Sequence, residues 1–155
     1  MPTLTDSHVF ELSRGEIVVS SDPDRLNLDV IHGYLVRSYW AKGVPRETLA
    51  RAVKNSLCFG AYDLAGQQVG FARAITDFAT FAYIADVFVL ESHRGKGIGK
   101  LLMECIKQHP ELQRLRRWTL STKDAHALYA QFGFTALNWP DRYMEILQPN
   151  IYETL

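Results

Sequence analysis

The sequence RGKGIG at residues 94–99 constrains this chain most, because of the segments on either side of it. An apolar run over 84–90 comes directly before it, and an amphipathic segment with Leu101, Leu102, Cys105 and Ile106 comes directly after. This order predicts a strand, a tight turn and a helix. Closely spaced glycines let the backbone approach a ligand, and the free amides at a helix start favour an anion such as a pyrophosphate.

Two well-known phosphate loops fit this turn badly. The dinucleotide fingerprint needs GxGxxG and an acidic residue about 20 positions later, but the glycines here fall as GxGxG and no such residue follows. The P-loop pattern GxxxxGK followed by Ser or Thr is absent, and Lys96 precedes the helix instead of opening it. Nucleotide binding through this turn is therefore a weak hypothesis.

A different pattern, R/Q-x-x-G-x-G/A, does match the turn at Arg94, Gly97 and Gly99. A second segment, DAHALY at 124–129 followed by FGF at 132–134, is similar to the pattern N-A-x-x-L/F-Y-x-x-x-G-F. About one helix and one strand separate the two. In these segments and their order the chain resembles the GNAT superfamily of acyl-CoA-dependent N-acetyltransferases. The resemblance covers most of the chain, from roughly Glu16 to Leu147.

Composition and length predict one soluble domain over 1–155 with a core of about 16–147. A chain of 155 residues hides roughly 70% of its unfolded surface. The charges balance, 17 basic against 17 acidic, which gives no electrostatic case for binding nucleic acid or an anionic membrane. Cys58 and Cys105 lack CxxC spacing, so neither a metal site nor a disulfide framework is expected.

The first residues do not resemble a targeting segment. Met1 to Arg14 has no basic start and no long apolar core, and no run approaches the length of a membrane span. Cytoplasmic location is the default expectation. The sequence leaves a monomer and a homodimer equally open.

Periodicity and turn signals predict alternating strands and helices. The expected strands are 16–20, 57–63, 68–75, 81–90, 118–122 and a closing pair at 135–137 and 142–147. The expected helices are one capped by Asp24 or Asn27 that reaches Tyr39, one opened by Pro45, and two over 99–108 and 124–132. The fold class is therefore α+β, with mixed strands and helices. The resemblance implies a GNAT-like domain whose mostly antiparallel, twisted sheet of six to seven strands contains a splayed pair and carries helices on both faces.

The resemblance also implies a co-substrate, acetyl-CoA, and no metal. In the family the splayed strand leaves backbone groups free for the pantetheine arm, and here these would belong to Phe88 and Val89. The residues expected to hold the pyrophosphate are Arg94, Gly95, Lys96, Gly97, Ile98, Gly99 and Lys100. Asp124 stands where the family usually has Asn, and an ionised carboxylate only accepts hydrogen bonds. Capping of a helix starting at Ala125 is the expected task for Asp124.

For catalysis, the resemblance assigns Tyr129 to protonation of the departing thiolate and the amide of Val89 to the oxyanion. The general base stays open between Asp86, Glu91 and water, because the glutamate of histone-type acetyltransferases is replaced by Tyr83. Asp86 would bind the amine or remove its proton through water, and a structural salt bridge is nearly as good an explanation. Strand alternation predicts Asp86 and Phe88 on one face, and Tyr83, Ala85, Val87 and Val89 on the other.

The acceptor is expected between the first two helices. Tyr39 and Trp40 could line a pocket for a cationic or aromatic amine, and core packing explains them equally well. His126 fits a helix surface better than a base. The sequence thus predicts an N-acetyltransferase acting on an amine of unknown identity, with a non-catalytic acyl-CoA-binding protein of the same fold as the alternative.

Overall fold

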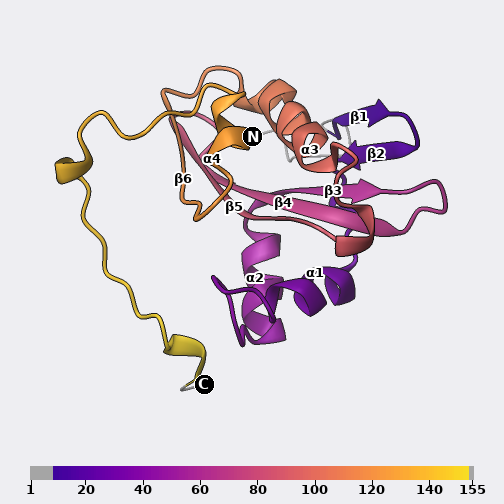
Figure 1. The fold of residues 1–155 in the computed structure, drawn as a ribbon, viewed down its shortest axis with the longest axis horizontal. Helices are drawn as coiled ribbons and strands as arrows, with labels where there is room; N and C mark the ends of the chain where they lie inside the picture. The colour runs from indigo at the N-terminus through magenta and orange to yellow at the C-terminus, as the bar shows by residue number, and fades with distance from the viewer. Residues whose placement is uncertain (1–8, 154–155) are drawn as a thin grey trace, which may run out of the picture.

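The computed structural model describes residues 9–153, and its frame is one six-stranded sheet in which the strands lie in sequence order (Figure 1). The strands are β1 (Glu11–Arg14), β2 (Ile17–Ser20), β3 (Leu57–Tyr62), β4 (Gln68–Thr76), β5 (Phe81–Val89) and β6 (Arg117–Leu120). All neighbours pair antiparallel except β5 and β6, which are parallel. This mostly antiparallel sheet with helices on both sides confirms the predicted fold class.

The helices cover the two faces of the sheet separately. They are α1 (Leu28–Leu35), α2 (Arg46–Lys54), α3 (Ile98–Gln108) and α4 (His126–Ala130). One buried cluster joins α1 and α2 to the sheet through Ile31, Leu49 and Phe88. A second cluster, on the other face, joins α3 and the Tyr129 side chain of α4 to the sheet. The Asn27 side chain caps α1 by accepting from the Val30 amide, as one of the two predicted caps.

Short 3-10 turns connect these elements. They are η2 (Pro23–Arg25), η3 (Glu91–His93), η4 (Pro110–Leu112), η5 (Pro140–Arg142) and η6 (Ile151–Glu153). None of the helices in the described part of the chain is long and apolar enough to cross a membrane. The first eight residues of the segment assessed for a targeting signal lie outside the described residues.

Several predicted boundaries were wrong. Strand β1 was not predicted, and α1 ends at Leu35 before it reaches Tyr39, because the Ser38 amide and hydroxyl both bond the Leu35 carbonyl. Helix α4 is shorter than predicted. The Thr122 hydroxyl, not the Asp124 carboxylate, accepts from the Ala125 amide at its start, so the predicted cap was wrong.

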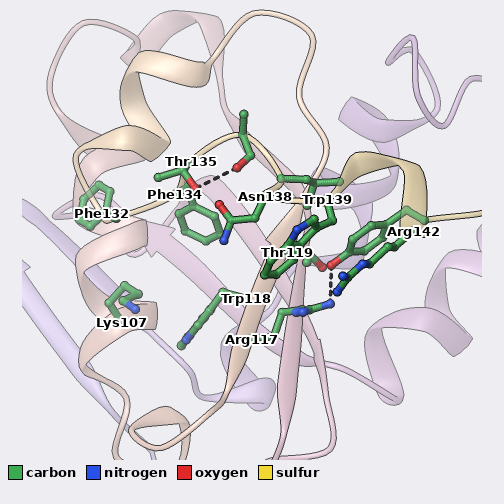
Figure 2. Close-up of a pocket in the computed structure, with 14 residues that line it drawn as sticks. Lys107, Arg117, Trp118, Thr119, Phe132, Phe134, Thr135, Asn138, Trp139 and Arg142 are labelled. Atoms are coloured by element: carbon green, nitrogen blue, oxygen red, sulfur yellow. Dashed lines mark hydrogen bonds between the residues drawn. The ribbon is translucent and has the colours of Figure 1, made fainter.

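The predicted closing strand pair is also wrong. Residues 135–147 form an extended, exposed segment interrupted by η5, and they pair with no strand that the structure describes. After α4 this segment runs away from the sheet and its helices (Figure 1). Where it starts, it borders a cavity of about 390 Å³ beside β6, lined by Trp118, Thr119, Phe132 and Phe134 among others (Figure 2).

Candidate functional site

The parallel strands β5 and β6 separate after a short ladder. Their pairing runs from Phe81 opposite Arg117 to Ile84 opposite Leu120, where β6 ends, while β5 continues to Val89. The second half of β5 therefore has no strand partner on its β6 side among the described residues. This is the splayed pair that the family resemblance implies.

The pairing of β5 with β4 decides which backbone groups face that open side. Leu90 donates its amide to the Val69 carbonyl at 2.9 Å, and Gly70 lies opposite Val89. In an antiparallel ladder successive residues point their amide and carbonyl to alternate sides. Phe88, opposite Phe71, is therefore turned toward β4, and Val89 toward the open side. The expectation that Phe88 offers free backbone groups has to be corrected.

A bulge in β5 changes the predicted alternation. Asp86 has a φ of +56°, and the register with β4 shifts at this point. Ile84 and Val87 both pack in the α3 cluster although they are three positions apart, so the bulge moves one residue out of phase. The prediction that Tyr83 shares a face with Val87 was therefore wrong.

The glycine turn presents a row of free donors. Gly95 and Gly97 both have a φ of +78°, a left-handed conformation that turns the backbone sharply into α3. The amides from Gly95 to Lys100 have no acceptor among the described residues, and Leu101 donates the first bond of the helix to the Gly97 carbonyl. These are six consecutive free amides at the start of an eleven-residue helix, the arrangement of donors that an anion would need.

Arg94 lies beside this row but uses its groups elsewhere. Its amide donates to the Glu91 carbonyl, and its side chain donates from Nε to the Val89 carbonyl at 3.2 Å and from Nη2 to the Tyr34 hydroxyl at 2.8 Å. The predicted set of pyrophosphate amides therefore begins at Gly95. Arg94 instead links the end of β5 to α1 through its hydrogen bonds to Val89 and Tyr34.

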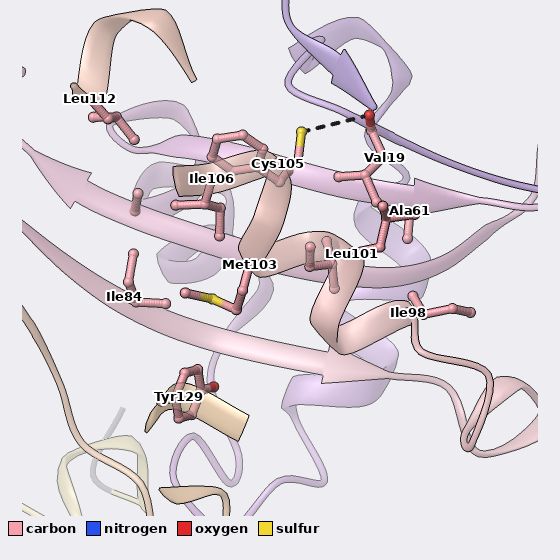
Figure 3. Packing of buried hydrophobic residues seen from close by; sticks show 14 of the residues in the cluster. Val19, Ala61, Ile84, Ile98, Leu101, Met103, Cys105, Ile106, Leu112 and Tyr129 are labelled. Carbon is pink, nitrogen blue, oxygen red and sulfur yellow. Dashed lines mark hydrogen bonds between the residues drawn. The ribbon is translucent and has the colours of Figure 1, made fainter. Parts of the chain in front are cut away.

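Gly99 brings the two predicted motifs together. A Cβ atom placed on Gly99 would lie 3.7 Å from Cδ2 of Leu128 and 4.0 Å from Cγ2 of Val89. The start of α3, the end of β5 and α4 therefore meet at this glycine. Tyr129 comes directly after Leu128 and lies at the edge of the α3 cluster (Figure 3).

The hydroxyl of Tyr129 is available for proton transfer. The residue is 8% exposed, and none of the hydrogen bonds among the described residues uses its hydroxyl. Burial raises the pKa of Tyr129, and the nearby Tyr39 and Asp124 raise it further. A raised pKa keeps the phenol protonated at neutral pH, as a general acid requires.

Asp86 has two partners within the protein. Its Oδ2 accepts from Nε of Arg73 at 2.8 Å, and its Oδ1 accepts from Nε1 of Trp40 at 3.0 Å. The Arg73 and Asp86 side chains are only 15% and 9% exposed, and Arg73 also donates to the Ser56 hydroxyl. Both carboxylate oxygens are thus engaged, which favours the structural salt bridge over the general base.

An aromatic group surrounds this ion pair on the side of α1. Tyr34 stacks on Phe88 with ring centroids 4.1 Å apart, and Trp40 lies 6.5 Å from Tyr34. Tyr39 and Trp40 are exposed at 63% and 41%, so core packing does not explain them. Glu91, the other candidate base, is exposed on η3, and His126 is exposed on α4, as expected for a residue of the helix surface.

Sequence reasoning missed Tyr34 and Arg73. In the sequence Tyr34 looks like any aromatic residue of an amphipathic helix, and its bond to Arg94 and its stacking on Phe88 become visible only in the folded chain. The signal for Arg73 was the hairpin of β4 and β5, which places Arg73 near the bulge that contains Asp86. A register estimate from the hairpin could have found this pair.

Cys58 lies next to this pair and Cys105 lies in α3, and both thiols are buried. Burial raises the pKa of each to about 12, with Arg73 lowering and Asp86 raising that of Cys58. Because the thiolate is the reactive form, the raised pKa leaves far less of it at pH 8. We expect native protein at pH 8 to react negligibly with Ellman's reagent and unfolded protein to release two equivalents. Rapid labelling of the native protein would contradict the burial of these thiols.

The chain is similar to acetyltransferases by sequence and by structure. The family described as "Acetyltransferase (GNAT) domain" matches residues 54–136. A Gibberella zeae protein with a provisional acetyltransferase assignment is 32% identical, over 77% of this chain and 78% of that protein. A crystal structure of a provisionally assigned GNAT acetyltransferase from Xanthomonas campestris pv. campestris is 47% identical with a TM-score of 0.86, over 90% of this chain and 99% of that chain.

A structure with a ligand extends this similarity. Rv2747 from Mycobacterium tuberculosis, in complex with CoA and NLQ, is 25% identical with a TM-score of 0.57, over 74% of this chain and 71% of that one. The splayed strands, the free amides and these similarities agree. The chain belongs to the GNAT acetyltransferase family.

Proposed function

We propose that this protein is an N-acetyltransferase that moves the acetyl group of acetyl-CoA to a primary amine of a small molecule or peptide by direct attack in a ternary complex. The observation that carries this proposal is the row of six free amides at the start of α3, next to the open side of Val89 and to Tyr129. The CoA found with Rv2747 supports the same class of co-substrate.

The residues of the turn fit acetyl-CoA. The amides of Gly95 to Lys100 match the donors that a pyrophosphate needs, and Lys96 and Lys100 are exposed beside them to supply positive charge. The Val89 carbonyl, which already accepts from Nε of Arg94, keeps a second lone pair that would accept from the pantetheine arm as from a neighbouring strand. Bound in this way, acetyl-CoA supplies an activated acetyl thioester at the split between β5 and β6.

Three groups of the chain would then serve the transfer. The Val89 amide donates to the acetyl oxygen as that oxygen gains negative charge. The Tyr129 hydroxyl donates its proton to the sulfur as the thiolate leaves. The base that removes the amine proton remains open between Glu91, water and Asp86, whose engaged oxygens make it the weakest of the three.

Asp86 and Trp40 are better suited to positioning the acceptor. The carboxylate holds the indole of Trp40, so the exposed aromatic surface of Tyr39 and Trp40 is fixed beside β5. Lys123 lies with its Nζ 5.4 Å from the centre of the Tyr39 ring and closes the other side. An amine carrying a flat or apolar group would suit this surface.

Asp86→Asn tests that positioning role. Asn keeps an oxygen for Trp40 and tolerates a positive φ, but it removes the charge that pairs with Arg73. We expect the free energy of unfolding to fall by about 2 kcal/mol, because a mostly buried guanidinium loses its charged partner. Turnover of the remaining folded protein should change less than about threefold. Thermal melting and steady-state rates on one sample measure both.

Arg73→Lys is the matched control for that variant. Lys keeps the positive charge but loses the fork that reaches Asp86 and Ser56 together. Its melting temperature should therefore fall less than that of Asp86→Asn. A large loss of turnover in Asp86→Asn with an unchanged melting temperature would instead make Asp86 the base.

Two assays test the function as a whole. Calorimetry with acetyl-CoA, ATP and NAD should give binding for acetyl-CoA alone. A screen of amines by release of free CoA thiol should then identify an acceptor. Tight binding of acetyl-CoA without thiol release on any amine would favour the non-catalytic acyl-CoA-binding protein.

A further inference from the structure

Val89 ends β5 without a strand neighbour on the side where the pantetheine arm is expected to bind. The ladder with β6 stops at Ile84, and the amide and carbonyl of Val89 point to the open side. Inside a sheet, the hydrogen bonds of a neighbouring strand fix the direction of such groups. The described strands give Val89 no such support on this side, so a side chain that bonds its carbonyl takes the place of the missing neighbour.

Arg94 supplies that bond. Its Nε donates to the Val89 carbonyl at 3.2 Å, and the side chain is exposed. A free arginine side chain samples many rotamers, and one long hydrogen bond in contact with water does not hold it in a single orientation. The orientation of Arg94 therefore depends on its second bond, from Nη2 to the Tyr34 hydroxyl at 2.8 Å.

Tyr34 can hold Arg94 because its own ring is fixed. The ring lies almost parallel to that of Phe88, with centroids 4.1 Å apart and 7° between the planes. Phe88 is only 3% exposed, and Ile31 and Leu35 on the same helix are fully buried in the cluster that joins α1 to the sheet. The Tyr34 hydroxyl is thus a fixed acceptor for the guanidinium of Arg94.

We propose that Tyr34 is a positioning residue of the co-substrate site, which acts through Arg94 to set the direction of the Val89 carbonyl. Nε of Arg94 takes one lone pair of that oxygen and leaves the other to an amide N–H of the pantetheine arm. This role rests on the proposed function, because it requires acetyl-CoA at the glycine turn. It concerns the arm alone, since the expected donors to the pyrophosphate are backbone amides that Tyr34 does not bond.

Tyr34→Phe tests this role, because it removes the hydroxyl and keeps the ring that stacks on Phe88. Calorimetry compares acetyl-CoA with phosphoadenosine diphosphate, the nucleotide part of CoA without the pantetheine arm. We expect acetyl-CoA to bind about tenfold more weakly, as for the loss of one hydrogen bond to a charged group. Phosphoadenosine diphosphate should bind as it does to the parent. The melting temperature should stay close to that of the parent, because the lost bond is exposed.

Tyr152→Phe is the matched control. Tyr152 packs against the same cluster of α1 and α2 as Tyr34, and none of the hydrogen bonds among the described residues uses its hydroxyl. Its loss should leave the affinity for both ligands unchanged. A tenfold weaker binding of acetyl-CoA in this variant too would mean that any change in the cluster disturbs the site, and the specific role of Tyr34 would fail.

A double variant shows whether Tyr34 acts through Arg94. Arg94→Met removes both side-chain bonds of Arg94, so Tyr34→Phe/Arg94→Met should bind acetyl-CoA no more weakly than Arg94→Met alone. The proposal is overturned if the two losses add up, if Tyr34→Phe weakens both ligands equally, or if Tyr34→Phe keeps the parent affinity for acetyl-CoA. A parent protein that binds neither ligand would overturn the proposed function itself, and this role with it.

Discussion

Replacing Tyr129 by Phe is expected to lower turnover by roughly 10²- to 10⁴-fold, the usual contribution of a positioned general acid. The change removes the hydroxyl and keeps the ring that packs in the α3 cluster. Acetyl-CoA affinity should stay nearly unchanged, because the free amides of the turn are untouched. Because no hydrogen bond among the described residues uses this hydroxyl, the free energy of unfolding should also change little.

Tyr62→Phe provides the matched control. Tyr62 is buried in β3 and its hydroxyl likewise has no hydrogen-bond partner among the described residues, but β3 is remote from the split between β5 and β6 in the strand order. Its removal should leave turnover unchanged. If Tyr129→Phe turns over a verified amine at the parent rate, Tyr129 takes no part in the reaction.

The pH profile gives an independent check on the same residue. Burial raises the pKa of Tyr129, so the phenol stays protonated through neutral pH and above its ordinary titration range. Deprotonation of this group removes the acid form and lowers turnover only as pH rises through the raised pKa. Between pH 7 and 9, turnover of the parent and turnover of Tyr129→Phe should therefore depend on pH in the same way. A fall in this range that only the parent shows would contradict the raised pKa of Tyr129.

Much of the frame was predictable because local signals agree with the packing. The apolar run of β5, the glycine turn and the amphipathic α3 follow one another, and α3 buries its apolar side where the periodicity places it. The closing strands over 135–147 were not predictable from their pattern. Their alternation is real, but a strand forms only when a neighbour accepts its hydrogen bonds, and the described part of the chain supplies none.

The part of the site that backbone groups form, the glycine turn, was predictable from the sequence. The part that side chains form around Asp86 was not. The glycine spacing indicated the turn, since few other residues adopt a φ of +78°. The partners of Asp86 depend on a bulge that strict strand alternation does not contain. Trp40 and Arg73 come from different elements, and only the folded chain brings them together on one carboxylate.

Replacing Gly97 by Val is expected to weaken acetyl-CoA binding by several kcal/mol, measured by calorimetry. Two effects combine: a β-branched residue resists a φ of +78°, and its side chain would occupy the open space in front of the amides. A Cβ atom at Gly97 meets no other atom within 4 Å, so the side chain does not collide with the fold, and the weaker binding comes from the space it takes in front of the amides. Lys96→Ala, which removes one exposed charge, should cost only about 1 kcal/mol.

Gly66→Val separates these two effects. Gly66 has a φ of +80° and equally open surroundings, but it lies in the turn between β3 and β4. It should therefore reproduce the loss of folding stability caused by a strained backbone, while acetyl-CoA binds as it does to the parent. If Gly97→Val lowers the melting temperature as Gly66→Val does but keeps the parent affinity, the strain is real and the amides of this turn do not hold the pyrophosphate.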